Sequence, residues 1–168
     1  MIRNISVIGI GKLGLCFSLT LEKAGHKVCG VDVNEEYVAS INEKTFNSSE
    51  LGVDEALRKS RNFRATTCLQ EAVDHSDFLF VVVATPSLRN GRYDHSQING
   101  LIEKLEKLGS KEGKNFVVCC TTMPGYCDSI KERLNTLGYT VSYNPEFIAQ
   151  GTILRDQDHP DMVLIGQG

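Results

Sequence analysis

The stretch "SVIGIGKLGLCFSLTLEKAGHKVCGVDV", residues 6–33, decides the fold of this chain. Its glycine turn, Gly9–Gly14 with the pattern Gly-x-Gly-x-x-Gly, follows an apolar run at residues 5–8 that is typical of a buried strand. Apolar residues then recur at helical spacing up to Gly25, where we expect the helix to end. A second predicted strand covers residues 26–32. A strand, a helix and a strand in this order form the right-handed crossover unit of a parallel sheet.

Strands and helices continue to alternate along the rest of the chain. Phe78–Val83 is apolar throughout, as expected of a strand covered by helices on both faces, so we place it near the centre of the sheet. Ser96–Leu108 has the clearest amphipathic spacing and predicts a helix. The other predicted elements are helices at Glu35–Glu43 and Asp128–Leu137, a short helix within residues 47–62, and strands at Arg64–Thr67, Phe116–Thr121, Tyr139–Tyr143 and Met162–Ile165. This order predicts an α/β fold, a Rossmann-type doubly wound parallel sheet in a single domain over residues 1–168.

The composition is that of an ordinary globular protein. Of its residues 41% are hydrophobic and 23% are charged, and the formal net charge of -3 gives no reason to expect a nucleic-acid partner. The longest uncharged apolar run, Phe78–Thr85, is far too short to cross a membrane. Because the N-terminal residues also lack the apolar core of a secretory signal, the sequence favours the cytoplasm.

The cysteine pattern argues against disulfides and metal sites. None of the six cysteines belongs to a Cys-x-x-Cys motif, and no histidine has the spacing of a zinc ligand. Most of them lie inside apolar periodic segments, where free cysteine is usually buried. We therefore predict reduced thiols and no bound metal.

The glycine turn predicts a bound dinucleotide, because it stands between a strand and the start of a helix. A pyrophosphate is favoured at such a helix N-terminus. Asp32 ends the second strand, where its carboxylate can accept hydrogen bonds from a ribose 2′-hydroxyl and would repel a 2′-phosphate, so we predict NAD rather than NADP. Asn34 is a further candidate for the ribose or adenine, and Lys12 lies close enough to help neutralise the phosphates. Alternatively, the glycines serve only the turn and Asp32 caps the next helix.

Polar residues also follow the predicted central strands. Residues 83–86 read Val-Ala-Thr-Pro and residues 121–124 read Thr-Thr-Met-Pro. Hydroxyl groups at these strand ends could contact the nicotinamide half of a dinucleotide, although Thr and Pro are also ordinary strand terminators. Glu146, which follows another predicted strand, could act as a base near a cleft or simply face water.

Together these motifs resemble the N-terminal half of the UDP-glucose/GDP-mannose dehydrogenase family. The resemblance rests on the glycine turn, on Val-Asp-Val-Asn at 31–34, on the two Thr/Pro breaks and above all on Asn-Pro-Glu-Phe-Ile-Ala-Gln-Gly-Thr at 144–152. It covers essentially the whole chain. It implies oxidation of the primary alcohol of a UDP- or GDP-linked sugar to a uronic acid, with two NAD consumed and a thioester formed on a catalytic cysteine.

The resemblance also implies roles for individual residues. The glycine turn would hold the pyrophosphate, and Asp32 would hold the adenosine ribose. Thr122 would position an oxygen near the reacting carbon, and Glu146 would act as acid and base in hydrolysing the thioester. Gln150 stands where the family often has a glutamate near the cofactor. The implied cofactor contacts are Gly9, Ile10, Gly11, Lys12, Leu13, Gly14, Asp32, Asn34, Ala84, Thr85, Pro86, Thr121, Thr122 and Gln150.

The Cys-Phe-Pro-Lys context of the family's nucleophile does not occur in this chain. The resemblance therefore implies a fragment that lacks the central helix and the sugar-nucleotide domain, binds the cofactor and is inactive alone. The parent protein is expected to be a homodimer, and the fragment itself could be a monomer. A stand-alone NAD-binding module is the alternative. A hydroxyacid dehydrogenase is disfavoured by the 144–152 motif.

Overall fold

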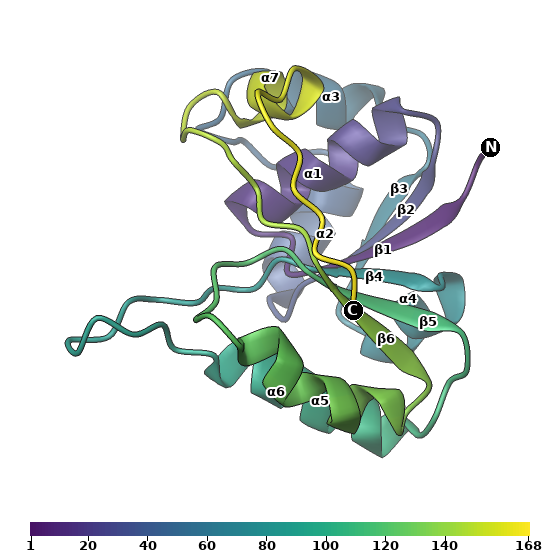
Figure 1. Ribbon diagram of the computed structural model, residues 1–168. Coiled ribbons are helices and arrows are strands. Elements are labelled where there is room, and N and C mark those ends of the chain that lie inside the picture. Colours follow the sequence, from purple (N-terminus) through teal and green to yellow (C-terminus); the bar gives the residue numbers. More distant parts are fainter.

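The opening motif folds as the sequence predicts. In the computed structural model, which describes all 168 residues, β1 (Asn4–Ile8), α1 (Lys12–Lys23) and β2 (Lys27–Val31) form a strand-helix-strand unit (Figure 1). β1 and β2 are parallel neighbours, with Ile5 opposite Val28. In each of the two strands every residue after the first is buried. The apolar runs on either side of the glycine turn are therefore central strands.

Six parallel strands make up the sheet, in the order β3-β2-β1-β4-β5-β6 (Figure 1). The later strands are β3 (Phe63–Thr66), β4 (Phe78–Val81), β5 (Lys114–Val118) and β6 (Tyr139–Tyr143). From β1 the chain builds outward to β3, then returns to the other side of β1 and builds outward from β4 to β6. This reversal between β1 and β4 leaves a crevice at the carboxyl ends of the strands. The predicted doubly wound parallel sheet is confirmed.

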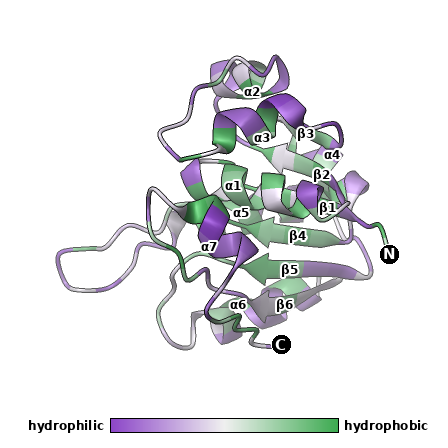
Figure 2. Cartoon of the chain, turned by 90° about the horizontal axis from the view of Figure 1, so that it is seen from above, coloured by the Kyte–Doolittle hydropathy of each residue, from purple (hydrophilic) through white to green (hydrophobic).

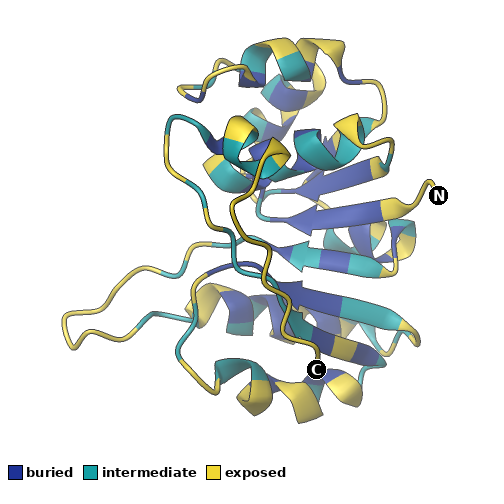
Figure 3. Cartoon of the chain, turned by 45° about the horizontal axis from the view of Figure 1, so that its top comes forward, coloured by how far each residue is buried: buried dark blue, intermediate teal, exposed yellow.

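Helices cover both faces of the sheet (Figure 1). One face carries α1, α2 (Glu35–Asn42), α3 (Val53–Lys59) and α7 (Ile153–Asp158), and the other carries α4 (Leu69–His75), α5 (Ser96–Leu108) and α6 (Tyr126–Asn135). The strands between them are rich in apolar residues (Figure 2) and are largely buried (Figure 3), so each face of the sheet has its own hydrophobic core. None of the helices has the length and apolar character needed to cross a bilayer.

The predicted strand at Met162–Ile165 is wrong. These four side chains are 40–69% exposed, and beyond them Gly166 forms only an isolated antiparallel bridge to Tyr143. The segment runs back past β6, the edge strand, and no further strand of the sheet pairs with it. An apolar run is therefore not sufficient for a strand when its backbone has no continuous partner.

Other differences are smaller. The short helices α4 and α7, of seven and six residues, were not predicted. β5 begins at Lys114 rather than Phe116 and ends at Val118 rather than Thr121, and α6 is displaced by two residues toward the N-terminus. Shifts of this size are common where terminal residues decide an element's limits.

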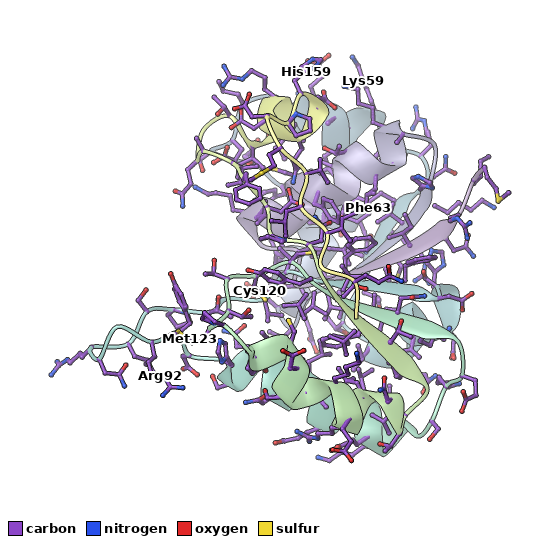
Figure 4. All side chains as sticks on the ribbon, viewed as in Figure 1. Lys59, Phe63, Arg92, Cys120, Met123 and His159 are labelled. Atoms are coloured by element: carbon purple, nitrogen blue, oxygen red, sulfur yellow. The ribbon has the colours of Figure 1, made fainter.

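The connection between β4 and α5 projects from the carboxyl edge of the sheet, and Figure 1 shows it as the long teal loop at the left. It folds back on itself: Leu88 N donates to Arg92 O at 2.7 Å, and Asp94 N donates to Pro86 O at 2.9 Å. Residues 86–92 are all exposed, and Figure 4 labels Arg92 on this loop. We call residues 86–94 the projecting hairpin.

Candidate functional site

A cavity of about 880 Å³ opens at the carboxyl ends of the strands. Its walls come from the glycine turn, the end of β2, the connections after β4 and β5, helix α5 and the segment after β6. Ten of the predicted site residues line it: Gly9, Gly11, Lys12, Leu13, Gly14, Asp32, Ala84, Thr85, Thr121 and Glu146. Residues that are far apart in the sequence thus meet where open α/β sheets bind their ligands.

Two of the three glycines in the turn are required by close packing. Gly9 has φ +90°, and a Cβ on it would lie 2.7 Å from Val82 O. A Cβ on Gly14 would lie 1.9 Å from Gly9 O, which backbone atoms cannot accommodate. Gly11 differs, since a Cβ there would meet no atom within 4 Å. The absence of a side chain at Gly11 therefore leaves open space beside the cavity rather than room for a neighbour.

Tyr37, which was not among the predicted site residues, holds the glycine turn in place through a hydrogen bond. Its hydroxyl donates to Ile10 O at 2.7 Å, and the side chain of Ile10 is fully buried in the core. Burial raises the pKa of Tyr37, and the nearby Asp32 raises it further, so the phenol stays protonated and able to donate. Ile10 therefore anchors the turn in the core and does not line the cavity, so its predicted contact with a cofactor stays a prediction.

Asp32 and Asn34, at the end of β2, have different contacts. Asn34 is the N-cap of α2, because its Oδ1 accepts a hydrogen bond from Tyr37 N at 3.0 Å. Asp32 lines the cavity, and its Oδ1 accepts a hydrogen bond from Asn34 N at 3.1 Å. The helix cap is thus Asn34, which counts against the alternative in which Asp32 serves only as a cap.

Two residues at the start of α5 hold the connections that follow β4 and β5. Gln97 Oε1 accepts a hydrogen bond from Ala84 N at 3.2 Å. His95 Nε2 accepts one from Met123 N at 3.3 Å, and the His95 ring lies against Tyr126 with centroids 3.8 Å apart. Burial lowers the pKa of His95, which favours the neutral ring that can accept this bond. Figure 4 labels Met123 beside the base of the projecting hairpin.

Glu146 faces the cavity from the segment after β6. Its Oε2 accepts a hydrogen bond from Gln157 Nε2 at 3.2 Å, and Gln157 Oε1 accepts one from Thr20 Oγ1 at 3.2 Å. Burial raises the pKa of Glu146, and the bond from Gln157 opposes this in part. A half-buried carboxyl with a raised pKa is better suited than an exposed one to take up and release a proton.

The structure does not bring every predicted contact into the cavity wall. Asn34 caps α2, Pro86 and Gln150 are exposed, and Thr122 is half-buried but does not line the cavity. Their roles toward a cofactor stay predictions. All six cysteines are free, and Cys119 and Cys120 line the cavity.

Residues 3–168 match the model of the UDP-glucose/GDP-mannose dehydrogenase family, NAD binding domain. The chain belongs to this family. It is the family's NAD-binding domain, as the sequence motifs implied. NAD as the cofactor is therefore confirmed at the level of the family.

Similar proteins include dehydrogenases of nucleotide sugars. GDP-mannose 6-dehydrogenase of Pseudomonas aeruginosa is 30% identical, with 98% of this chain and 41% of that protein covered. The uncharacterized protein MJ1054 of Methanocaldococcus jannaschii is 32% identical, with 97% of this chain and 18% of that protein covered. The structure of a UDP-glucose dehydrogenase from Pyrobaculum islandicum superposes with a TM-score of 0.88 at 27% identity, over 100% of this chain and 41% of that one. This chain spans about two fifths or less of these relatives.

The glycine turn of this NAD-binding domain fits a pyrophosphate. No side chain caps the N-terminus of α1, and no acidic residue lies in its first turn. The first backbone N–H groups of a helix have no partner within the helix, and they carry its positive dipole end. Together with the open space at Gly11, these groups form a cradle for phosphate oxygens.

Proposed function

We propose that this chain is the cofactor half of a dehydrogenase that oxidises the primary alcohol of a UDP- or GDP-linked sugar to the acid, with two NAD consumed. The observation that carries the proposal is that Glu146 and the glycine turn face one cavity, although 132 positions separate Glu146 from Gly14. The relatives named as UDP-glucose and GDP-mannose 6-dehydrogenases support the substrate class.

Each wall of the cavity has a binding task in this proposal. Backbone N–H groups at the start of α1 bind the pyrophosphate, and Asp32 accepts hydrogen bonds from the adenosine ribose. Ala84, Thr85 and Thr121 line the cavity and would flank the nicotinamide. A bound NAD would supply the hydride acceptor for oxidation of the sugar carbon. The protein's task is to hold the two reactants in line and to exclude water from the transfer.

Glu146 supplies the acid and base in this proposal. Its raised pKa suits the removal of a proton from a water molecule that attacks a thioester, with Thr122 positioning that oxygen. The bond from Gln157 orients the carboxyl toward the cavity. The reaction cycle therefore needs Glu146 from this chain and a thiol from elsewhere.

The thiols of this cavity are poor nucleophiles. Burial raises the pKa of Cys120 to about 11 and also raises that of Cys119, so both are protonated at neutral pH. We therefore assign the nucleophile to a part of the protein outside these residues. On this assignment the isolated chain binds NAD but forms no NADH with UDP-glucose or GDP-mannose.

The test is product analysis on the full-length protein with each sugar nucleotide. Two NADH formed per molecule of sugar acid is the expected result. Release of an aldehyde or ketone after one NADH would overturn the assignment. Binding of NAD without reduction by any sugar nucleotide would instead favour a stand-alone NAD-binding module.

A further inference from the structure

Glu50 is a buried carboxylate that the proposed reaction does not use. It lies in the connection between α2 and α3 and is only 4% exposed. A buried carboxylate is destabilising unless charged or hydrogen-bonding partners surround it. The identity of its partners therefore indicates what this residue does.

The local turn is held by other side chains. Ser48 N donates to Asp54 Oδ1 at 2.7 Å, and Glu50 N donates to Ser48 Oγ at 3.1 Å. Ser48 and Asp54 thus stabilise the start of α3 through bonds within this connection. The carboxylate of Glu50 makes its contacts with distant parts of the chain instead.

One partner of that carboxylate lines the cavity, and the other belongs to the segment that carries Glu146. Gly151 N lies 3.0 and 2.7 Å from its two oxygens and donates to them from a position 101 residues further along. Lys12 Nζ lies 3.5 Å from Oε1. Lys12 is part of the glycine turn, and Gly151 is part of residues 144–152, the segment that carries Glu146. Glu50 therefore bridges the phosphate-binding side and the proton-transfer side of one cavity.

We propose that Glu50 is a positioning residue that fixes the segment 144–152, and with it Glu146, relative to the glycine turn. The inference rests on the proposed function, since it concerns the reaction only through the role of Glu146. When the bridge is lost, the segment separates from the glycine turn and the carboxyl of Glu146 becomes more hydrated. Glu50 touches no reacting atom and does not itself line the cavity, so it acts through Gly151 and Lys12.

The test follows the titration of Glu146 by carboxyl-carbon NMR in the labelled chain, together with thermal melting. Glu50→Gln keeps the size of the side chain and removes its charge, whereas Glu50→Asp keeps the charge and shortens the reach. Asp54→Asn is the matched control, since Asp54 bonds within the same connection. We expect both Glu50 variants to lower the pKa of Glu146 toward the ordinary value of about 4.3, because hydration favours the charged form. The control should leave that titration unchanged.

Two results would overturn the inference. If the Glu50 variants only lower the melting temperature, as the control does, Glu50 is a structural residue. If Glu50→Gln shifts the titration and Glu50→Asp does not, the cause is charge rather than position.

Amide hydrogen exchange in the unmodified chain gives a second measurement that does not depend on a variant folding. The Gly151 amide should exchange at least about tenfold more slowly than that of its exposed neighbour Gln150, after correction for intrinsic rates. Equal rates would contradict the bridge. Neither measurement needs NAD, so a failure of the proposed function would be recognised separately.

Discussion

At the scale of single residues, two carboxylates face the same cavity in different surroundings. Asp32 accepts a hydrogen bond from the backbone N–H of Asn34, whereas Glu146 accepts one from the neutral amide of Gln157 and is half-buried. The first arrangement suits a fixed hydrogen-bond acceptor, and the second suits a group that exchanges a proton. Each role leads to a separate prediction.

Asp32→Ala should weaken NAD binding by roughly 10- to 100-fold, because a hydrogen bond to a charged group contributes about 1.5–3 kcal/mol. The same change should reduce the preference for NAD over NADP, since the charge that repels a 2′-phosphate is gone. Calorimetric titration of the chain with each cofactor measures both effects. Glu112→Ala, which removes an exposed carboxylate just before β5 at the opposite edge of the sheet, is the control. Equal affinity of wild type and Asp32→Ala for NAD would remove Asp32 from the site.

Glu146→Gln should stabilise the isolated chain at pH 7. The folded-state pKa of Glu146 is raised by burial, so its contribution to stability is fully present below the unfolded pKa and is lost as the pH rises through the folded pKa. The amide of Gln does not titrate and can still accept the bond from Gln157. Melting curves between pH 3 and 8 should therefore show a gain for the variant at neutral pH that disappears in acid. A gain that is the same at every pH would contradict the raised pKa.

The residues that support the site were harder to predict than those that line it. Gly9, Gly11, Gly14 and Asp32 are recognisable because they stand at fixed positions relative to one strand and one helix. Tyr37, Gln97 and Glu50 act through contacts with parts of the chain 27, 13 and 101 residues away. No local pattern encodes such contacts, so only the folded chain identifies these residues.

At the scale of elements, the N-terminus of α1 combines packing with binding. Gly14 lets the helix lie against the backbone of Gly9, and Gly11 leaves its first turn open toward the cavity. We therefore expect Gly14 to be needed for packing and Gly11 to be needed for binding.

Gly11→Ala should affect mainly NAD binding, and Gly14→Ala should affect mainly the stability of the fold. Gly11→Ala should leave the melting temperature nearly unchanged, since nothing lies within 4 Å of the new Cβ, but weaken NAD binding at least about tenfold by filling the phosphate cradle. Gly14→Ala should destabilise the chain by about 1–3 kcal/mol or more, because its Cβ would meet Gly9 O. Denaturant unfolding and calorimetric titration of both variants test this contrast. A large stability loss in Gly11→Ala alone would reverse the assignment.

Helices and strands with a strong period were predicted, whereas the two short helices α4 and α7 were not. Ser96–Leu108 begins and ends as predicted, because its apolar spacing extends over three turns. Helix α4 follows Cys68, whose side chain makes no capping hydrogen bond, so its start carries no signal. The Met162–Ile165 segment shows the opposite error, since its apolar side chains imitate a buried strand while remaining exposed.

At the scale of the whole molecule, the sheet separates two hydrophobic cores, and each core contains free cysteine side chains. Cys29 and Cys120 belong to the core under α4, α5 and α6, and Cys16 belongs to the core under α1. Cys68 is exposed, and Cys127 is half-buried. Thiol reactivity can therefore report on the integrity of the fold.

In the native chain, Cys68 should react with a thiol reagent first, while Cys16 and Cys29, which are buried and do not line the cavity, should react only as the chain unfolds. Burial raises the pKa of Cys16 to about 12 and that of Cys29 to about 11, so little reactive thiolate exists at neutral pH. Saturating NAD should slow the late reaction and leave the rate at Cys68 unchanged. Rapid reaction of all six cysteines before unfolding would be incompatible with two closed cores.

The projecting hairpin has a consequence for how the polypeptide can be divided. Exposed loop tips are the preferred positions for proteolytic cleavage, and Arg89 and Arg92 offer trypsin two such positions outside the sheet. A cut there leaves β3, β2, β1 and β4 in one fragment and β5 and β6 in the other, still joined by the β4–β5 pairing of Phe78 through Val81 with Asn115 through Val118. The hairpin is thus a suitable position at which to divide the chain. Two fragments made separately are suited to reassemble through the β4–β5 pairing, which restores the cavity.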